Sequence, residues 1–300
     1  MNRRRFLISA LPAASLAGAA GSVFAADTAP HFSFIHFTDL HIQPELHAGA
    51  GCAKCVVKMN SLKPDFAICG GDLVFDANEQ GYPRAKQLYD LYEETLKPLQ
   101  TRVHTVVGNH DVFGVSTKSG VAQSDPHYGK RMFEDRIGKT FSSFDYQGWH
   151  FVMLDSIGSR PGQDFIGLID EAQVEWLKSD LAHMKPGTPL VVVTHVPLAS
   201  AVMQTVADSW KTPETYLVTN AREVLNILWP YHPKMVLQGH THIRENVVYN
   251  GCQFITSGAV CGNWWKGPRE GHPEGFGVLT VRGDRIDWRY ETYGFVADPA

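Results

Sequence analysis

The sequence predicts an α/β protein in which a second β-sheet packs on the first. From residue 31 onward, short apolar runs alternate with segments of helical period, which is the pattern of α/β sheets. Clusters of His, Asp, Asn and Gly stand at the ends of these runs, where open α/β sheets bind their ligands. After residue 246 only short strand-like runs separated by turns follow, and these favour an antiparallel sheet.

The whole-chain composition fits a globular protein with a complete core. The chain has 300 residues, of which 44% are hydrophobic and 19% are charged, so one sizeable domain is expected, with two smaller domains as the alternative. The same composition argues against disorder. The formal net charge is −4, which argues against stable binding to nucleic acid. An anionic substrate would therefore need a local positive centre.

Residues 1–26 have the composition of an export signal rather than of a core. Three arginines at positions 3–5 precede an Ala/Gly/Leu-rich stretch, and residues 23–25 offer a cleavage site. This pattern resembles a twin-arginine signal, with an ordinary secretory signal or an uncleaved anchor as alternatives. Pro12 interrupts the stretch, which disfavours a spanning helix. We expect the twin-arginine machinery to export the chain to the periplasm or beyond, leaving a mature domain at 27–300 with no membrane span.

The first part of this domain shows three strands and two long helices. In chain order, strands are expected at residues 31–38, 65–69 and 103–107, and helices at about 50–62 and 79–96. Apolar residues recur at helical spacing through Leu88, Tyr92 and Leu96. Residues 112–140 are polar and contain several glycines. We expect a long loop there, of the kind that is often functional.

The second part begins with a hairpin and ends in short strands. The expected elements are strands at 141–145, 150–154, 190–193 and 235–237, helices at 170–184 and 219–229, a loop at 199–216, and then strands at 247–249, 253–256, 276–281 and 285–290. Turn residues at Asn250-Gly251 and Gly283-Asp284 separate the last four strands in pairs.

Five cysteines leave at least one thiol unpaired. Cys52-x-x-Cys55 is compatible with a redox pair or half of a zinc site, but no second Cys-x-x-Cys exists. We favour two thiols on one face of a helix, open to bridging after export. Cys69 lies inside an apolar run and is expected in the core.

Five polar clusters carry the chemistry. They are Asp39-x-His41, Gly70-Gly71-Asp72, Gly108-Asn109-His110-Asp111, His195 and Gly239-His240-Thr241-His242. This mixture of carboxylate, amide and imidazole groups suits Fe, Mn or Zn better than Ca or Mg. Seven side chains exceed the needs of one ion and would hold two if a carboxylate bridged them. Asp72 is the natural bridge, because the two glycines before it let the backbone approach.

In this order the clusters resemble those of the calcineurin-like metallophosphoesterase superfamily, from about residue 34 to 257. The resemblance implies a four-layer αββα fold, in which helices flank a two-sheet β-sandwich. It also implies that Asp39, His41 and His242 hold one metal ion, that Asn109, His195 and His240 hold the other, and that Asp72 bridges them. His110 would stand beside the phosphate and protonate the leaving oxygen, with Asp111 orienting it.

The activity that the resemblance implies is hydrolysis of a small phosphoester by a metal-bridging hydroxide. A phosphodiester is preferred, because related bacterial single-domain members include cyclic-nucleotide phosphodiesterases. A phosphomonoesterase with the same metals is one alternative, and a non-catalytic scaffold is another. Purple acid phosphatases, which belong to the same superfamily, place a tyrosine ligand where this chain has Phe75. The metal pair is therefore expected to be Fe/Mn, Mn/Mn or a zinc-containing pair.

The segment at residues 262–267 is the candidate substrate wall. Asn263, Trp264, Trp265 and Lys266 could stack on a flat group and contact phosphate. The alternative is that the two tryptophans close the core of the second sheet. His127 and Arg131 are weaker candidates for the opposite rim.

Overall fold

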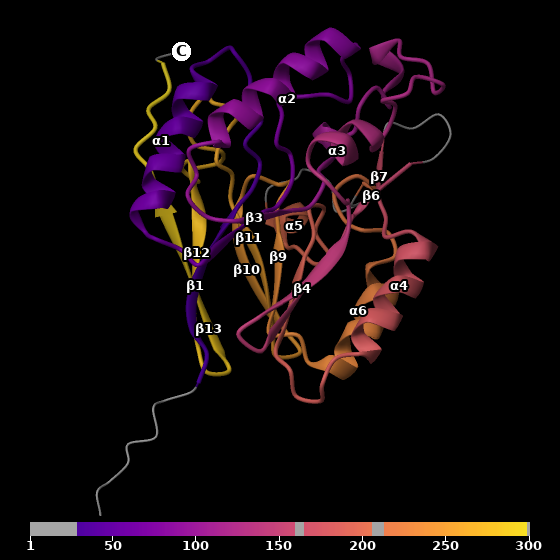
Figure 1. The fold of residues 1–300 in the computed structure, drawn as a ribbon, viewed down its shortest axis with the longest axis vertical. Coiled ribbons are helices and arrows are strands. Elements are labelled where there is room, and N and C mark those ends of the chain that lie inside the picture. Colours follow the sequence, from indigo (N-terminus) through magenta and orange to yellow (C-terminus); the bar gives the residue numbers. More distant parts are fainter. Residues whose placement is uncertain (1–28, 160–164, 206–212, 299–300) are drawn as a thin grey trace, which may run out of the picture.

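Two β-sheets pack face to face with helices on both outer sides, as Figure 1 shows. The structure is a computed structural model, and it describes residues 29–159, 165–205 and 213–298. The predicted signal at 1–26 lies outside the described residues. Within them, no helix is both long enough and apolar enough to cross a membrane. The predicted fold class, a helix-flanked two-sheet sandwich, is confirmed.

The first sheet has the strand order β13-β12-β1-β2-β3. Its strands are β1 (His31–Phe37), β2 (Phe66–Cys69), β3 (Val103–Thr105), β12 (Gly275–Arg282) and β13 (Arg285–Thr292). The first three are parallel to one another, and β12 and β13 extend the sheet in antiparallel fashion on the other side of β1.

The second sheet has the order β10-β11-β9-β8-β5-β4. It contains β4 (Ser142–Tyr146), β5 (Trp149–Met153), β8 (Leu190–Val193), β9 (Met235–Gln238), β10 (Arg244–Tyr249) and β11 (Cys252–Ser257). Four inner strands are parallel, and β4 and β10 run antiparallel at the two edges.

The expected antiparallel tail does not form a sheet of its own. β11 pairs in parallel with β9, while β12 pairs with β1. The last four strands are thus divided between the two sheets. The alternation of apolar and polar residues predicted where these strands lie in the sequence. It could not predict which strands they pair with, because pairing depends on contacts between segments far apart in the chain.

Alternate residues of the strands build two separate apolar layers. Phe32 and Phe34 of β1 belong to the layer between the sheets, together with Val191 and Val193 of β8. Their neighbours in sequence face outward and pack with the helices. Phe34 stacks on Phe66 with ring centroids 4.8 Å apart, and such aromatic pairs add about 0.5–1.5 kcal/mol beyond their buried area.

Four longer helices cover the outer faces. They are α1 (Ala48–Ser61), α2 (Tyr82–Leu96), α4 (Glu171–Ala182) and α6 (Ala221–Leu228). α1 and α2 lie on the side of the first sheet, whereas α4 and α6 lie beside the second (Figure 1). Asp170 caps α4, since its carboxylate accepts a 2.8 Å hydrogen bond from the backbone N–H of Gln173.

Short elements lie between the longer ones. They are α3 (Arg131–Arg136), β6 (Ile157–Gly158), β7 (Ile166–Gly167), α5 (Val202–Thr205) and the 3₁₀ turns η1 (Asn109–Asp111), η2 (Thr117–Ser119) and η3 (Trp229–Tyr231). Three of them, α3, η2 and α5, fall within the expected loops at 112–140 and 199–216. None of the short elements is long enough to produce a hydrophobic period in the sequence.

All five cysteines are buried free thiols. Cys52 and Cys55 lie on the buried face of α1, as expected, and they are not bridged to each other. Burial raises the pKa of the Cys55 thiol. The thiolate that would react with an oxidant is therefore disfavoured in the folded protein.

Candidate metal centre

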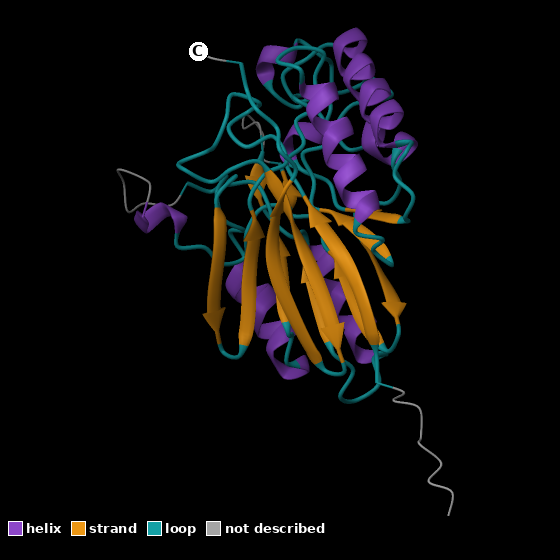
Figure 2. Cartoon of the chain, turned by 90° about the vertical axis from the view of Figure 1, so that its left-hand side faces the viewer, coloured by secondary structure: helices purple, strands orange, loops and turns teal. Residues whose placement is uncertain are grey.

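The five polar clusters meet at one edge of the sandwich. Asp39 and Asp72 follow β1 and β2, and His195 and His240 follow β8 and β9. Figure 2 shows the loops gathered above the ends of the strands. Both sheets therefore contribute side chains to one place.

Five of the seven predicted ligands have left-handed backbone conformations. Positive φ angles occur at Asp39 (56°), His41 (42°), Asp72 (54°), His240 (73°) and His242 (61°). Such conformations cost free energy in residues other than glycine, and they persist where the surroundings impose them, often at functional sites. Here they turn side chains that leave different strands toward a common point.

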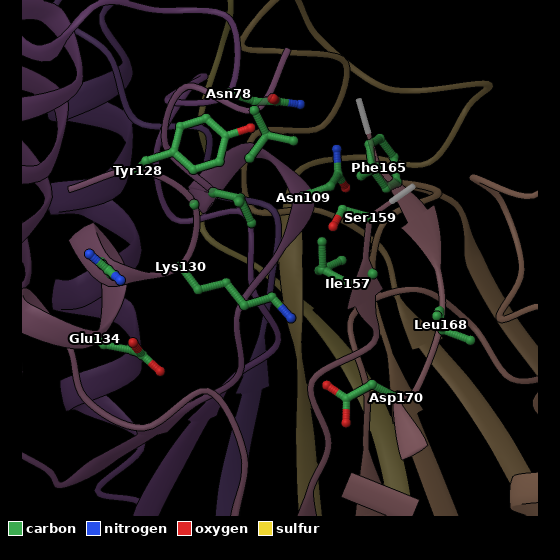
Figure 3. Close-up of a pocket in the computed structure, with 15 residues that line it drawn as sticks. Asn78, Asn109, Tyr128, Lys130, Glu134, Ile157, Ser159, Phe165, Leu168 and Asp170 are labelled. Carbon is green, nitrogen blue, oxygen red and sulfur yellow. The ribbon is translucent and has the colours of Figure 1, made fainter. Parts of the chain in front are cut away.

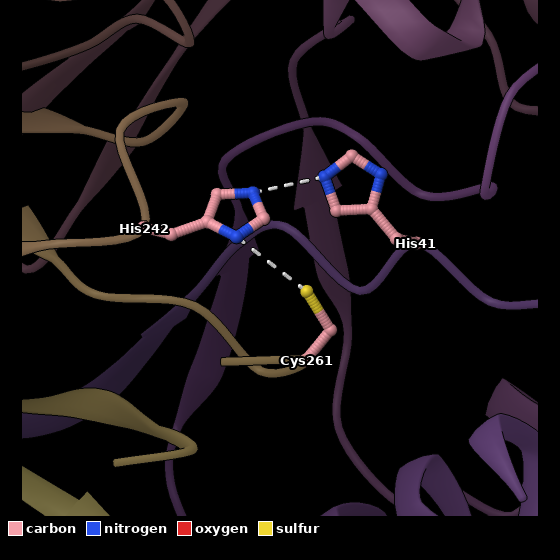
Figure 4. A group of neighbouring side chains, drawn as sticks. All are labelled: His41, His242 and Cys261. Carbon is pink, nitrogen blue, oxygen red and sulfur yellow. Dashed lines mark hydrogen bonds between the residues drawn. The ribbon is translucent and has the colours of Figure 1, made fainter. Parts of the chain in front are cut away.

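The first group of ligand atoms centres on His41. Its Nε2 atom lies 3.0 Å from Nε2 of His242 and 3.8 Å from Oδ1 of Asp39. Nε2 of His242 is 3.4 Å from the same Asp39 oxygen. Figure 4 shows the two imidazole rings with nitrogens pointing at each other. Facing nitrogens beside a carboxylate are the donor set that a transition-metal cation binds.

The second group centres on His195. Its Nε2 atom lies 3.1 Å from Oδ2 of Asp72 and 3.2 Å from Oδ1 of Asn109. Nδ1 of His240 is buried without a hydrogen-bond partner among the described residues. His240 also offers a ring nitrogen within 4.8 Å of ligand atoms of Asp72 and His195. A buried imidazole nitrogen without a partner is costly unless a ligand satisfies it.

One oxygen of Asp72 belongs to both groups. Oδ2 is 3.1 Å from His195 Nε2 and 3.4 Å from His41 Nε2. The other oxygen, Oδ1, accepts a 2.9 Å hydrogen bond from the backbone N–H of His110. Asp72 is thus fixed between the two halves of the site, in the place predicted for the bridging carboxylate.

Backbone carbonyls hold the outer nitrogens of three histidines. Nδ1 of His195 lies 2.8 Å from the carbonyl oxygen of Gly70, and Nδ1 of His242 lies 2.6 Å from that of Gly262. His41 makes a longer contact of 3.4 Å to the carbonyl oxygen of Phe75. A carbonyl oxygen only accepts hydrogen bonds, so these contacts place N–H at Nδ1 and leave Nε2 available to bind a metal.

Two glycines permit the close approach of these loops. A Cβ atom on Gly108 would lie 2.2 Å from the backbone nitrogen of Asp72, and one on Gly239 would lie 2.3 Å from Oγ1 of Thr38. A side chain at position 108 would displace the backbone of Asp72, and one at position 239 would displace the Thr38 hydroxyl that donates to Asp39.

The charges of the buried groups also fit a cation. Burial would raise the pKa of Asp39, but the charge of His242 lowers it to about 2. Burial would lower the pKa of His195, but the Asp72 carboxylate raises it to about 9. The site therefore holds buried carboxylate charges that positive charge must compensate. The described donor set fits two metal ions that share Asp72.

His110 stands at the rim of the site, although a nitrogen of its ring lies within 4.8 Å of ligand atoms of His41 and Asp72. Its side chain is 26% exposed, and its ring centroid is 4.8 Å from that of His41. Oδ1 of Asp76 lies 3.7 Å from its Nδ1 atom. Although burial lowers the pKa of His110, the carboxylates of Asp72 and Asp76 raise it above its usual value.

Asp111 does not orient the His110 ring, contrary to expectation. Its carboxylate accepts backbone N–H groups of Asp72 at 2.9 Å, Leu73 at 2.7 Å and Gly108 at 2.8 Å. It therefore ties two ligand loops together, and Asp76 is the carboxylate that faces His110. Asp76 follows Asp72 by four residues, but the sequence contains no pattern that singles it out.

The cavity over the metal centre has a volume of about 330 Å³. It is lined by Asp72, Asn109, His110, Phe165, Thr215, Tyr216, His240, Thr241, His242, Trp264 and Arg269. Trp264 is the one member of the predicted substrate wall among these residues, and its ring centroid lies 3.9 Å from that of His41. Arg269 was not predicted.

The other members of the predicted wall lie elsewhere. Trp265 is 1% exposed, and its indole N–H donates to the carbonyl oxygens of Leu40 and His41. Trp265 packs in the core beside Gly51 of α1 and Phe295. The alternative interpretation, in which both tryptophans close the core of the second sheet, therefore does not hold for Trp264 and is wrong about the place of Trp265. Asn263 contacts Arg269 instead of lining the cavity, and Lys266 is exposed to solvent.

A second cavity of about 460 Å³ adjoins the first and shares Asn109 and Phe165 with it. Figure 3 shows Tyr128 and Lys130 on the wall opposite Phe165. Lys130 is paired with Asp155 at 2.6 Å. Arg131 also lines this cavity, whereas His127 does not and instead stacks against Tyr82.

Known proteins share both sequence and fold with this chain. The sequence profile of the calcineurin-like phosphoesterase family matches residues 32–244. The 3′,5′-cyclic adenosine monophosphate phosphodiesterase CpdA of Haemophilus influenzae is 27% identical over 202 residues, which cover 66% of this chain and 61% of that protein. A probable cyclic nucleotide phosphodiesterase of Rhodococcus erythropolis is 22% identical, over 77% of this chain and 72% of that protein.

A solved structure shows the same fold. The dimetal phosphatase from Danio rerio superposes with a TM-score of 0.64 at 16% identity, over 88% of this chain and 97% of that one. At this identity the likeness concerns the fold alone. The match with the Haemophilus protein spans less than two thirds of that protein's length.

Proposed function

Because this chain belongs to the calcineurin-like phosphoesterase family, we propose that it hydrolyses phosphoesters with two metal ions. The observation that carries this proposal is the position of Asp72, whose Oδ2 atom approaches ligand nitrogens of both groups. Asp39, His41 and His242 would hold one ion and Asn109, His195 and His240 the other, with Asp72 shared. Iron, manganese and zinc all suit these oxygen and nitrogen donors.

Such ions supply Lewis-acid polarisation of the phosphoryl group and activation of a water molecule near neutral pH. The residues of this chain do the rest. His110 faces the cavity from its rim and, when protonated, can donate a proton to the leaving oxygen. Asp76 faces Nδ1 of the same ring and favours its protonated form. Trp264 covers His41 and His242 and shields the ligands from bulk water.

A phosphodiester is the proposed substrate class. Two sequence relatives are named as phosphodiesterases of cyclic nucleotides. The second cavity, which opens beside Asn109, offers room for the second organic group of a diester. A phosphomonoesterase with the same ligands is the alternative and would not need that cavity. A non-catalytic scaffold is the other alternative, and the complete ligand set argues against it.

The site of action belongs to the same proposal. The arginines at positions 3–5 and the apolar stretch after them support export by the twin-arginine route to the periplasm or beyond. Immunoblots of cell fractions from wild type and from a variant with these arginines changed to lysine would test it. Equal amounts of mature protein outside the cytoplasm in both strains would contradict this route.

The activity is tested by metal analysis followed by paired assays. The purified protein, loaded with Mn²⁺, Fe²⁺ or Zn²⁺ in turn, is expected to bind two ions per chain and to hydrolyse bis(p-nitrophenyl) phosphate faster than p-nitrophenyl phosphate. Fewer than two bound ions under replete conditions would contradict the dinuclear centre. Faster hydrolysis of the monoester would favour the alternative activity.

A further inference from the structure

Arg269 is the single Lys or Arg side chain among the described residues that line the cavity over the metal centre. The protein as a whole is acidic, with a formal net charge of −4, so its overall field repels an anionic substrate. A cationic side chain in this cavity would add to the attraction that bound metal ions exert on an anionic phosphoester. Lys266, which was expected to contact phosphate, is exposed and lies outside the lining.

The backbone of Arg269 is held by a tight turn. Its N–H donates to the carbonyl oxygen of His272 at 2.9 Å, and the N–H of His272 donates back at 2.7 Å. The two residues between them, Glu270 and Gly271, have φ angles of 46° and 79°. Two successive positive φ angles are typical of the type I′ turn, which fixes the ends of a hairpin closely. The guanidinium group thus projects from a rigid base.

The side chain is also oriented before any ligand arrives. Asn263 accepts a 3.1 Å hydrogen bond from Nη1 of Arg269. The Nε atom of Arg269 is buried and has no hydrogen-bond partner among the described residues. A buried N–H without a partner costs free energy, and a planar guanidinium presents such donors in a geometry that matches phosphate oxygens. Asn263 therefore positions a guanidinium group whose Nε donor lacks an acceptor among the described residues.

We propose that Arg269 binds an anionic oxygen of the phosphoryl group, with Asn263 as its positioning residue. This inference rests on the proposed function and adds the residue that recognises the charge of the substrate. It predicts that anionic phosphoesters bind and that neutral phosphotriesters of similar size do not. Because the contact forms with bound substrate as well as in the transition state, its loss should affect KM more than kcat.

The test measures binding of inorganic phosphate to the Mn²⁺-loaded protein by calorimetry, which does not depend on turnover. Arg269→Ala is expected to raise the Kd for phosphate about 10- to 100-fold, while metal analysis still shows the wild-type ion content. Arg269→Lys should recover part of the affinity because it keeps the charge. Arg285→Ala, which removes an exposed arginine on β13, is the matched control and should bind phosphate as wild type does.

Asn263→Ala tests the positioning role with a kinetic readout. It should raise KM for the diester substrate several-fold, leave kcat within about twofold, and have no further effect in the Arg269→Ala background. An additive effect on KM in the double variant would contradict that role.

Two results would overturn the proposal. One is an unchanged Kd for phosphate in Arg269→Ala at wild-type metal content. The other is a raised Kd for phosphate in Lys266→Ala while Arg269→Ala binds phosphate as wild type does. If the metal-loaded wild type cleaves neither substrate but binds phosphate in an Arg269-dependent manner, this inference stands and the proposed activity falls.

Discussion

Two histidine–aspartate clusters lie at opposite ends of the strands of the second sheet, and they differ in geometry. At the metal centre, carboxylates and imidazoles direct several atoms toward a shared space. At the other end, near the start of β5, the His150 cluster consists of one imidazole between two carboxylates. Nδ1 of His150 lies 2.7 Å from Asp145, and Nε2 lies 2.9 Å from Asp180.

The difference separates a candidate metal site from a closed hydrogen-bonded cluster. In the His150 cluster both ring nitrogens already have partners on opposite sides, so the three side chains satisfy one another. At the metal centre, the Nδ1 atoms of His195 and His242 are hydrogen-bonded to backbone carbonyls. Their Nε2 atoms face the other ligand atoms. The two clusters also differ in backbone conformation. His150 lies in the regular strand β5, whereas five predicted ligands have positive φ angles.

The largest expected effect comes from changing one carboxylate in each cluster. Asp72→Asn should lower the rate of diester hydrolysis by more than about 100-fold and reduce the metal content, because a ligand matters at least as much as the groups around it. Asp180→Asn should leave both quantities near wild type. Metal analysis and steady-state kinetics on both variants check this. If Asp72→Asn still bound two ions per chain, the proposed role of Asp72 as the shared ligand would be contradicted.

A smaller effect on the rate of diester hydrolysis is expected from changing His110, which lies beside the ligands and is not proposed to be one. His110→Ala should lower kcat about 10²- to 10⁴-fold while both ions stay bound. Asp76→Asn should have a weaker effect in the same direction, because Asp76 favours the protonated ring. kcat and metal content are the measurements. Full activity in His110→Ala would exclude this residue as the proton donor.

A still smaller effect, on metal affinity, is expected from removing the Thr38 hydroxyl, which supports the ligand Asp39. Thr38 donates a 2.7 Å hydrogen bond to Oδ2 of Asp39. Thr38→Val should weaken metal affinity by about 10- to 100-fold, as measured by competition with a chelator. Ser143→Ala is the matched control, since Ser143 donates at 2.6 Å to Asp180 in the His150 cluster. Equal metal affinities in the two variants would mean that outer hydrogen bonds do not distinguish the clusters.

The smallest effect is the pH dependence of stability in the His150 cluster. Burial works against protonation of His150, but its contacts with Asp180 and Asp145 raise its pKa in the folded protein. This stabilisation is fully present below the unfolded pKa of about 6.5 and is lost as the pH rises through the folded value. Partial solvent screening keeps it below about 1 kcal/mol.

Thermal unfolding of metal-free wild type and Asp180→Asn at pH 6 and pH 9 measures this effect. The difference in Tm between the two proteins should be larger at pH 6. A larger difference at pH 9 would contradict the charged form of His150 in the folded state.

Most of the fold could be predicted because its elements repeat a local pattern. The strand at Leu190–Val193 and the long helices have clear apolar periods. The seven ligand candidates were recognisable because their clusters follow apolar runs in a fixed order, and the structure brings them together. Their assignment to two ions stays a prediction.

Other features depend on contacts that no local pattern records. β12 pairs with β1, which is more than 230 residues away in the chain. Asp76 faces His110 because the loop after β2 hydrogen-bonds to the His110 backbone through Ala77. Arg269 stands at the start of a four-residue turn beside the cavity. Asp111 looked like an orienting partner of its neighbour in sequence. In the folded chain its carboxylate instead accepts hydrogen bonds from backbone amides.

Strand β1 lies inside the first sheet, and its two neighbours are synthesised at very different times. Phe34 pairs with Phe66 on one side and with Leu279 on the other. The ribosome adds residues in order, so one edge of β1 stays without its neighbour during most of translation and presents free backbone N–H and C=O groups. Until the closing hairpin emerges, that edge is open to pairing with another strand.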